Sequence, residues 1–146
     1  MNQSTKIRGL ILDMDGVLWR GQAPIGNLAR NFEIIHQLGL GVVLATNNAT
    51  RNPTQYAAKL QGLGINLDPG QIVNSAMATA HYLQKHYPQG GDIFVVGEQS
   101  LADTIAAAGF TISAERPLAV VAALHRGINY EILTKATSLI QGGAIF

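Results

Sequence analysis

Short hydrophobic runs alternate with amphipathic segments along the whole chain. The runs at 9–12, 41–45, 93–96 and 117–124 have the length of buried strands, and polar or glycine-containing turns follow them. Between them, hydrophobic residues recur at helical spacing. Strands that alternate with helices predict an α/β fold with a parallel sheet. The expected helices run from Pro24 to Gly39, from Pro53 to Gly64, from Ser75 to Tyr87, from Leu101 to Ala108 and from Tyr130 to Gln141.

Polar and glycine-rich positions divide this pattern. Asn74, Ser100 and Asn129 are expected to cap the helices that follow them, and 17–22 should form a loop or small hairpin. Gln89-Gly90-Gly91 is the best linker in the chain, so we expect two parts, 1–88 and 89–146. The hydrophobic run at 144–146 is short for a strand. From this ending we expect a chain that is truncated, or whose remainder lies elsewhere.

The composition excludes several classes of protein. The chain has 146 residues, a net charge of +1 and no run of Lys or Arg, so neither a nucleic acid nor a membrane surface is an expected partner. It contains no cysteine, which excludes disulfides, thiol nucleophiles and Cys-bound zinc. Charged residues make up 13% of the chain, whereas about 25% is typical, so part of the surface is expected to be covered. We expect a cytoplasmic protein.

Two aspartates follow the first hydrophobic run. Side chains two residues apart on a strand point to the same side, so Asp13 and Asp15 would bring two carboxylates together. A hard divalent cation, Mg²⁺ above all, relieves the repulsion between them. Gly16 allows a sharp turn just beyond the pair. Asp-x-Asp-Gly alone fits a simple turn equally well, but the strand before it favours a site, because ligands gather where parallel strands end.

A second polar turn follows the run at 41–45. Thr46, Asn47 and Asn48 offer a hydroxyl, side-chain amides and backbone N–H groups, which suit a phosphate or a carboxylate. Helix capping and turn formation explain the same residues equally well. Trp19, the only tryptophan, could pack in the core or wall the pocket, and packing is the favoured interpretation.

In combination, the two turns resemble those of a known family. Asp13-Met14-Asp15-Gly16-Val17-Leu18, with Thr46-Asn47-Asn48 at the end of the next long strand, is similar to the haloacid dehalogenase superfamily, subclass IIA, the NagD-like and p-nitrophenyl phosphatases. The resemblance covers nearly the whole chain. It implies a Rossmann-like doubly wound parallel sheet in 1–88, and the first part of an α/β cap domain, apparently truncated, in 89–146.

The resemblance also implies a reaction. Asp13 would be the nucleophile that forms an aspartyl-phosphate, and Asp15 would be the general acid and base. Mg²⁺ would be held by the Asp13 carboxylate and the backbone carbonyl of Asp15. Thr46, Asn47 and Asn48 would bind the phosphoryl oxygens. The substrate would be a small phosphorylated metabolite, with nucleotide monophosphates, sugar phosphates and phosphoglycolate all still open, as is a homodimer.

The chain also departs from the family pattern. A lysine and a further acidic cluster, which the family supplies after its cap, have no counterpart here, so the chain by itself is expected to be a poor catalyst or none. Where relatives have Gly-Leu-Asp-Arg, this chain has Ala123-Leu124-His125-Arg126, and we interpret His125 as a surface substitution. Two other classes stay open. One is a non-catalytic or incomplete binding module; the other, weakly supported, is a metal-dependent nucleotide-sugar transferase.

Overall fold

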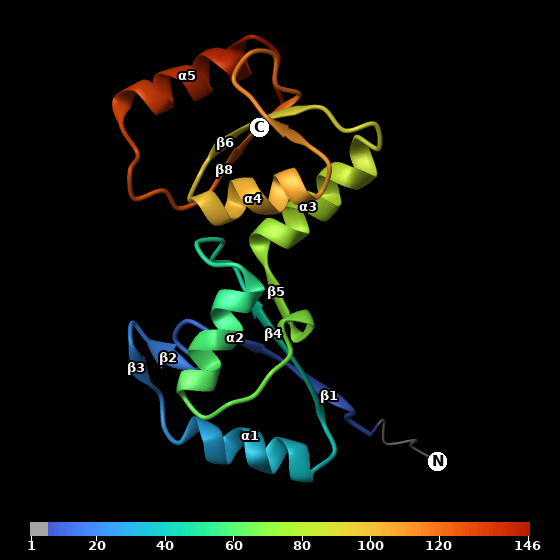
Figure 1. Cartoon of the computed structure of the whole chain (residues 1–146), viewed down its shortest axis with the longest axis vertical. Coiled ribbons are helices and arrows are strands. Elements are labelled where there is room, and N and C mark those ends of the chain that lie inside the picture. The colour runs from blue at the N-terminus through green and yellow to red at the C-terminus, as the bar shows by residue number, and fades with distance from the viewer. Residues whose placement is uncertain (1–5) are drawn as a thin grey trace. The chain divides into compact units, whose positions relative to one another are not determined.

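The computed structural model describes residues 6–146. Within them the chain forms two compact units. The first contains residues 6–46 and 53–73, and the second contains residues 47–52 and 74–146. Each unit has a parallel sheet with helices packed on it, so the α/β class with parallel sheets is confirmed (Figure 1).

The first unit is built on a sheet whose strands are ordered β1-β4-β5. Strands β1 (Gly9–Asp13) and β4 (Gly41–Thr46) are parallel, and their register pairs Gly9 with Gly41 and Asp13 with Ala45. The remaining elements are the antiparallel pair β2 (Trp19–Arg20) and β3 (Ala23–Pro24), the helices α1 (Leu28–Gln37) and α2 (Pro53–Gly62), a 3₁₀ turn η1 (Pro69–Gln71) and β5 (Ile72–Asn74).

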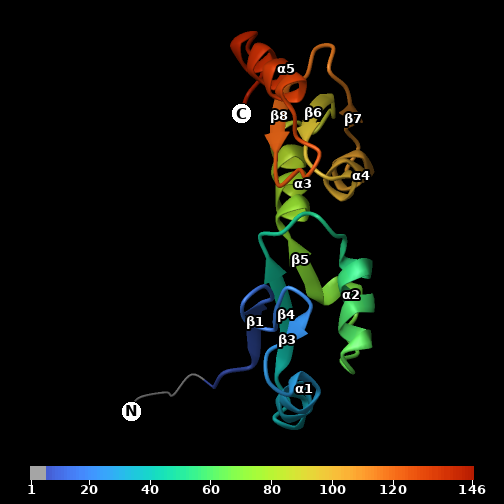
Figure 2. The same ribbon diagram turned by 90° about the vertical axis from the view of Figure 1, so that its left-hand side faces the viewer.

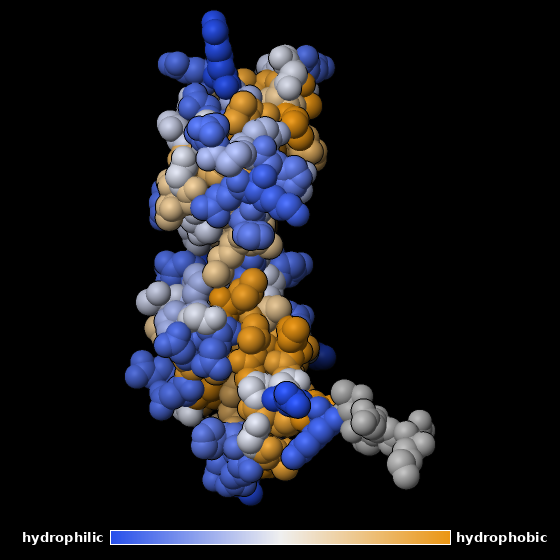
Figure 3. All heavy atoms as spheres, turned by 90° about the vertical axis from the view of Figure 1, so that its right-hand side faces the viewer, coloured by the Kyte–Doolittle hydropathy of each residue, from blue (hydrophilic) through white to orange (hydrophobic). Residues whose placement is uncertain are grey.

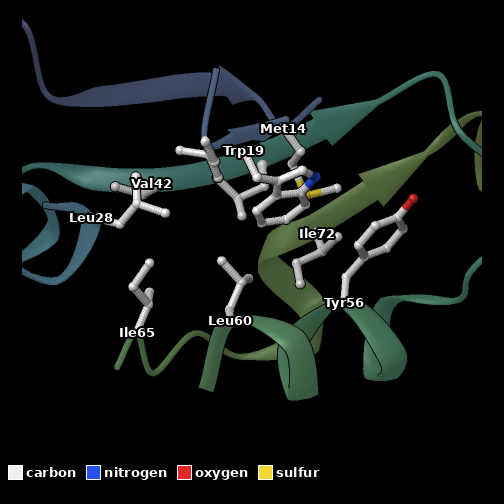
Figure 4. Packing of buried hydrophobic residues seen from close by; sticks show 10 residues of the cluster. Met14, Trp19, Leu28, Val42, Tyr56, Leu60, Ile65 and Ile72 are labelled. Atoms are coloured by element: carbon white, nitrogen blue, oxygen red, sulfur yellow. The ribbon is translucent and has the colours of Figure 1, made fainter. Parts of the chain in front are cut away.

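Both helices of this unit pack on one face of the sheet. Leu44 of β4, Leu60 of α2 and Ile72 of β5 are fully buried in a single cluster, which Figure 4 shows from close by. Strand residues alternate between the two faces, and on the opposite face Ile11 is 78% exposed, with Val43 and Val73 also exposed. Figure 2 shows α2 to one side of the strands, and Figure 3 shows hydrophobic side chains gathered on this unit's surface.

The second unit has a three-stranded parallel sheet ordered β7-β6-β8. Ile145 extends it, because its N–H donates to the carbonyl of Leu118 and its own carbonyl accepts from Val120. The expected strand start at 144–146 is thereby confirmed as a parallel bridge. The elements are α3 (Ser75–His86), β6 (Asp92–Val96), α4 (Gln99–Ala107), β7 (Thr111–Ile112), β8 (Ala119–Ala122) and α5 (Tyr130–Gln141).

Most expected elements form, but several boundaries were wrong. Pro24 does not begin a helix; it ends β3, and α1 starts after Asn27, whose side chain accepts from the N–H of Arg30. Ser100 is not the cap of α4, because Glu98 occupies that position and makes no side-chain cap. The short strand β7 was not foreseen. The expected caps at Asn74 and Asn129 are confirmed, since each accepts a backbone N–H three residues on.

Helix α3 precedes the predicted boundary at 88–89 in the sequence. Ala76 and Leu83 of α3 are buried in a cluster with Ile93 and Ile105. By its contacts, α3 therefore groups with the second unit, although it was placed with the first part on sequence grounds. The division into a core at 1–88 and a cap at 89–146 stays a prediction.

The expected linker at Gly90-Gly91 is a close-packed turn. Gly90 has a φ of +73°, and a Cβ placed there would lie 2.8 Å from the carbonyl oxygen of Gly109. We expect Gly90→Ala to lower the free energy of unfolding by about 1–3 kcal/mol, because the backbone is strained and the neighbouring carbonyl must move. Gly109→Ala is the control, since that glycine has a positive φ but open space around it. Urea unfolding that ranks Gly109→Ala as the more damaging change would contradict the close approach.

Candidate active site

Asp13 and Asp15 lie at the carboxyl end of β1. Asp13 is the last residue of the strand, and its Oδ1 accepts the N–H of Met14 at 2.8 Å. Met14 is fully buried in the core of the first unit, whereas both aspartates are exposed. This alternation agrees with the expectation that the two carboxylates share one side of the chain. The hydrogen bond from the Met14 N–H fixes the orientation of the Asp13 carboxylate.

The loop after the strand is closed by its own backbone. The N–H groups of Leu18 and Trp19 point to the carbonyl of Met14, at 2.8 and 3.3 Å, and the N–H of Gly16 donates to the carbonyl of Trp19 at 2.7 Å. Gly16 has a φ of +87°, so the expected sharp turn is present. The loop leads into the β2–β3 pair, which confirms the expected small hairpin beside the site.

Thr46 is brought to the same edge of the sheet by the strand register. Asp13 pairs with Ala45, and Thr46 is the next residue and the last of β4. Because β1 and β4 are parallel, their carboxyl ends meet at one edge. Thr46 is 7% exposed. Of the predicted phosphate-binding residues, it is therefore the one that the register places beside the predicted nucleophile.

Asn47 and Asn48 belong by contacts to the second unit. Asn48 Oδ1 accepts from both the N–H and the hydroxyl of Thr50, at 3.0 and 2.7 Å. The carbonyl of Asn47 accepts from Ser75 Oγ at 2.8 Å. The turn-forming interpretation of Asn48 thus has direct support, and the role of both amides as phosphate ligands stays a prediction.

Trp19 has contacts that the sequence did not reveal. It is 1% exposed, so packing is correct, but its indole Nε1 also donates to Asp15 Oδ1 at 2.8 Å. Lys59 Nζ lies 3.7 Å from the centre of the Trp19 ring. No motif in the chain links Trp19 with Lys59. The contact between Asp15 and Trp19 could have been expected from their spacing of four residues, because a tight loop brings such residues together.

The donor atoms at this edge fit a hard cation in kind. Asp13 and Asp15 supply carboxylate oxygens, which Mg²⁺ prefers. Among residues 6–146, however, no group of three or more His, Cys, Asp or Glu side chains could hold a metal ion. The pair alone is a sparse site for an ion that usually needs several protein or substrate oxygens.

No helix within residues 6–146 is long and apolar enough to cross a membrane.

A polar cluster lies where β6 and β8 end in the second unit. Glu98 Oε1 accepts the N–H of Arg126 at 3.0 Å and its guanidinium at 3.2 Å. The Arg126 backbone N–H is the main cause of a lowered pKa of Glu98, outweighing an opposing effect of burial. His125 is less exposed than a surface substitution implies, and its Nδ1 is buried with no hydrogen-bond partner among the described residues.

Comparison with known proteins identifies the family. The sequence profile of the haloacid dehalogenase-like hydrolases matches residues 10–111. An acid sugar phosphatase of Staphylococcus epidermidis is 29% identical over 137 residues, which cover 93% of this chain and 52% of that relative. The structure of NagD from E. coli K-12 superposes with a TM-score of 0.86 at 31% identity, over 96% of this chain and 55% of that one.

A glycerol phosphate phosphatase from Mycobacterium tuberculosis, solved in complex with magnesium, has a TM-score of 0.83 at 31% identity. That match covers 92% of this chain and 41% of the other. The chain thus spans about half the length of the relatives it matches.

The chain belongs to the haloacid dehalogenase-like hydrolases. Within them it falls in the NagD-like and p-nitrophenyl phosphatase group, subclass IIA, and it matches the N-terminal part of those proteins.

Proposed function

We propose that the site at the carboxyl ends of β1 and β4 performs Mg²⁺-dependent hydrolysis of a small phosphomonoester through an aspartyl-phosphate. The observation that carries the proposal is the register of β1 with β4. It sets Asp13, the residue at the end of one strand, against Ala45, so that the hydroxyl-bearing Thr46 ends the neighbouring strand. An exposed carboxylate beside a polar donor at this edge is the arrangement that phosphoryl transfer requires.

In the first step, an Asp13 carboxylate oxygen attacks phosphorus and the bond from phosphorus to the leaving oxygen breaks. Asp15 gives a proton to that oxygen, which departs as an alcohol. The Met14 N–H donates to Asp13 Oδ1 and so fixes the orientation of the attacking carboxylate. The Thr46 hydroxyl donates to a phosphoryl oxygen as the charge on it redistributes.

In the second step, Asp15 accepts a proton from water, and the water oxygen attacks the phosphorus of the aspartyl-phosphate. The bond between phosphorus and Asp13 breaks, which releases inorganic phosphate, restores the Asp13 carboxylate and leaves Asp15 protonated for the next turnover. A magnesium ion, when bound by the Asp13 carboxylate and the backbone carbonyl of Asp15, would offset the negative charge that the substrate brings to this acidic edge.

A phosphorylated sugar or polyol is the substrate class with most support. One relative is named as an acid sugar phosphatase and another as a glycerol phosphate phosphatase. The predicted phosphate-binding residues contact only the phosphate group, so other residues must recognise the alcohol part of the substrate.

The proposal predicts slow turnover by the 146-residue chain. We expect p-nitrophenol release from p-nitrophenyl phosphate at high protein concentration, at a rate far below that of full-length relatives, because the described residues lack a three-ligand acidic cluster. The rate should rise with Mg²⁺ into the millimolar range without saturating, and chelation should abolish it. Intact-mass measurement after an acid quench should detect a phosphorylated fraction.

Asp103→Asn is a matched control for this assay, because Asp103 is an exposed carboxylate on α4. The control should retain the slow rate. If wild type and Asp13→Asn release p-nitrophenol equally, or if neither does, then the chain is a binding module without phosphatase chemistry of its own.

A further inference from the structure

Trp19 does more than fill the core of the first unit. The indole ring is 1% exposed, among the fully buried side chains of the cluster in Figure 4. Its only hydrogen-bond donor, Nε1–H, is directed at Asp15 Oδ1 at 2.8 Å. A fully buried ring is thus joined to an exposed carboxylate that lies two residues from Asp13. A buried indole N–H needs a hydrogen-bond acceptor, and here that acceptor is a carboxylate of the predicted site.

The indole is itself held by helix α2. The ring of Tyr56 stacks on it, with ring centres 6.5 Å apart and planes inclined by 13°. Lys59 Nζ lies 3.7 Å from the centre of the Trp19 ring and donates to the carbonyl of Gly21 at 3.3 Å. Tyr56 and Lys59 are three residues apart, so they lie on the same side of α2. One helix face therefore restrains the ring plane.

The backbone restrains the other end of the contact. Gly16 N–H donates to the carbonyl of Trp19, and Trp19 N–H points to the carbonyl of Met14. Asp15 and Trp19 also form an isolated bridge. With both backbones tied, the indole N–H leaves the Asp15 side chain little choice of rotamer, because a different χ1 would forfeit the hydrogen bond.

We propose that Trp19 is the positioning residue for Asp15. Its indole N–H holds the carboxylate in the one rotamer from which a proton can pass to the leaving oxygen, and α2 keeps the indole in place. The functional part of this inference rests on the proposed phosphatase reaction. Geometry of this kind matters because a general acid acts only within hydrogen-bond reach of its target, and a shift of about 1 Å can cost a hundredfold in rate.

Trp19→Phe tests the inference, because it keeps an aromatic ring and removes the N–H. The couplings between the Asp15 Hα and its two Hβ protons, measured by NMR on the 146-residue chain, report the χ1 rotamer without any turnover. We expect couplings of a single rotamer in wild type and averaged values in Trp19→Phe. Leu60→Val is the matched control: it loosens the same core cluster but keeps the indole, so it should retain the single rotamer.

A second measurement tests the consequence for the reaction. The value of kcat/KM reports the steps up to cleavage of the substrate's P–O bond. A nitrophenolate leaves without help, whereas an alkoxide needs a proton. In Trp19→Phe we expect kcat/KM for glycerol phosphate to fall about 10- to 100-fold, and that for p-nitrophenyl phosphate to fall less than about threefold. A general loss of structure would lower both equally.

The two measurements separate the possible failures. An unchanged single Asp15 rotamer in Trp19→Phe, or averaging in Leu60→Val as well, overturns the positioning role. An equal fall for both substrates overturns the role in proton transfer. If wild type itself shows no Asp13-dependent turnover, the proposed function fails, and the couplings alone then decide whether Trp19 holds Asp15.

Discussion

Asp13→Asn should abolish the turnover of p-nitrophenyl phosphate. The substitution keeps the size of the side chain and its carbonyl oxygen, which can still accept the Met14 N–H that now reaches Oδ1. It removes the anionic oxygen that would attack phosphorus, and no other described residue is assigned that role. A lost nucleophile leaves only the slow attack of water, so we expect a loss of at least about three orders of magnitude, down to the assay background.

Phosphate binding should survive this change, and that makes the test specific. The variant loses one carboxylate ligand of Mg²⁺, but it also loses one negative charge that repels the anion, so the binding of inorganic phosphate should stay measurable. Titration calorimetry in Mg²⁺ would measure this, with the Asp103→Asn chain as the control for the charge change. A variant that turns over at a rate near wild type would end the covalent mechanism.

Thr46 should have the second-largest effect. Thr46→Ala removes a hydroxyl at the end of β4, next to the residue that pairs with Asp13. We expect kcat to fall by about 10²–10³, the usual cost of one lost donor to a charged transition state. KM should change much less, because the contact strengthens as charge develops.

Two further variants separate the hydroxyl from packing, since Thr46 is 7% exposed and its methyl group is buried with it. Thr46→Ser keeps the hydroxyl and should recover most of the rate. Thr46→Val keeps the shape and should behave like Thr46→Ala. Equal rates in Ser, Val and Ala would show that the hydroxyl has no part in the reaction. Thermal unfolding of all three would separate a loss of stability from a loss of rate.

The strands and the position of the aspartates were predictable from sequence because each depends on local information. A hydrophobic run followed by Asp-x-Asp-Gly specifies a buried strand, its end and a turn, and β1 ends at Asp13 as expected. The caps at Asn74 and Asn129 are equally local, since each side chain reaches an N–H three residues away. These predictions succeeded because the interactions that form each feature join residues only a few positions apart.

The failures have different causes. Pro24 suits the first turn of a helix, but its pairing with Trp19 across the hairpin decided its structure. Ser100 is a good cap by type, yet α4 already begins at Gln99, so Ser100 lies inside the helix and its Oγ is buried with no partner among residues 6–146. The contact of Lys59 with the Trp19 ring joins residues far apart in the chain, and no pattern in either segment announces it. Tertiary contacts of this kind outweigh local preference.

The hexapeptide 47–52 has a consequence for any attempt to dissect the protein. The chain passes from one unit to the other at 46–47, at 52–53 and at 73–74. Asn74 Nδ2 donates to the carbonyl of Arg51, and Ser75 Oγ to that of Asn47, so the hexapeptide is fastened to the start of α3. Neither unit is a continuous stretch of sequence. A cut in the gene after Val73 would leave residues 47–52 in the first fragment and place their hydrogen-bond partners, Asn74 and Ser75, in the second. Recombination at this point should therefore not yield two modules that fold independently.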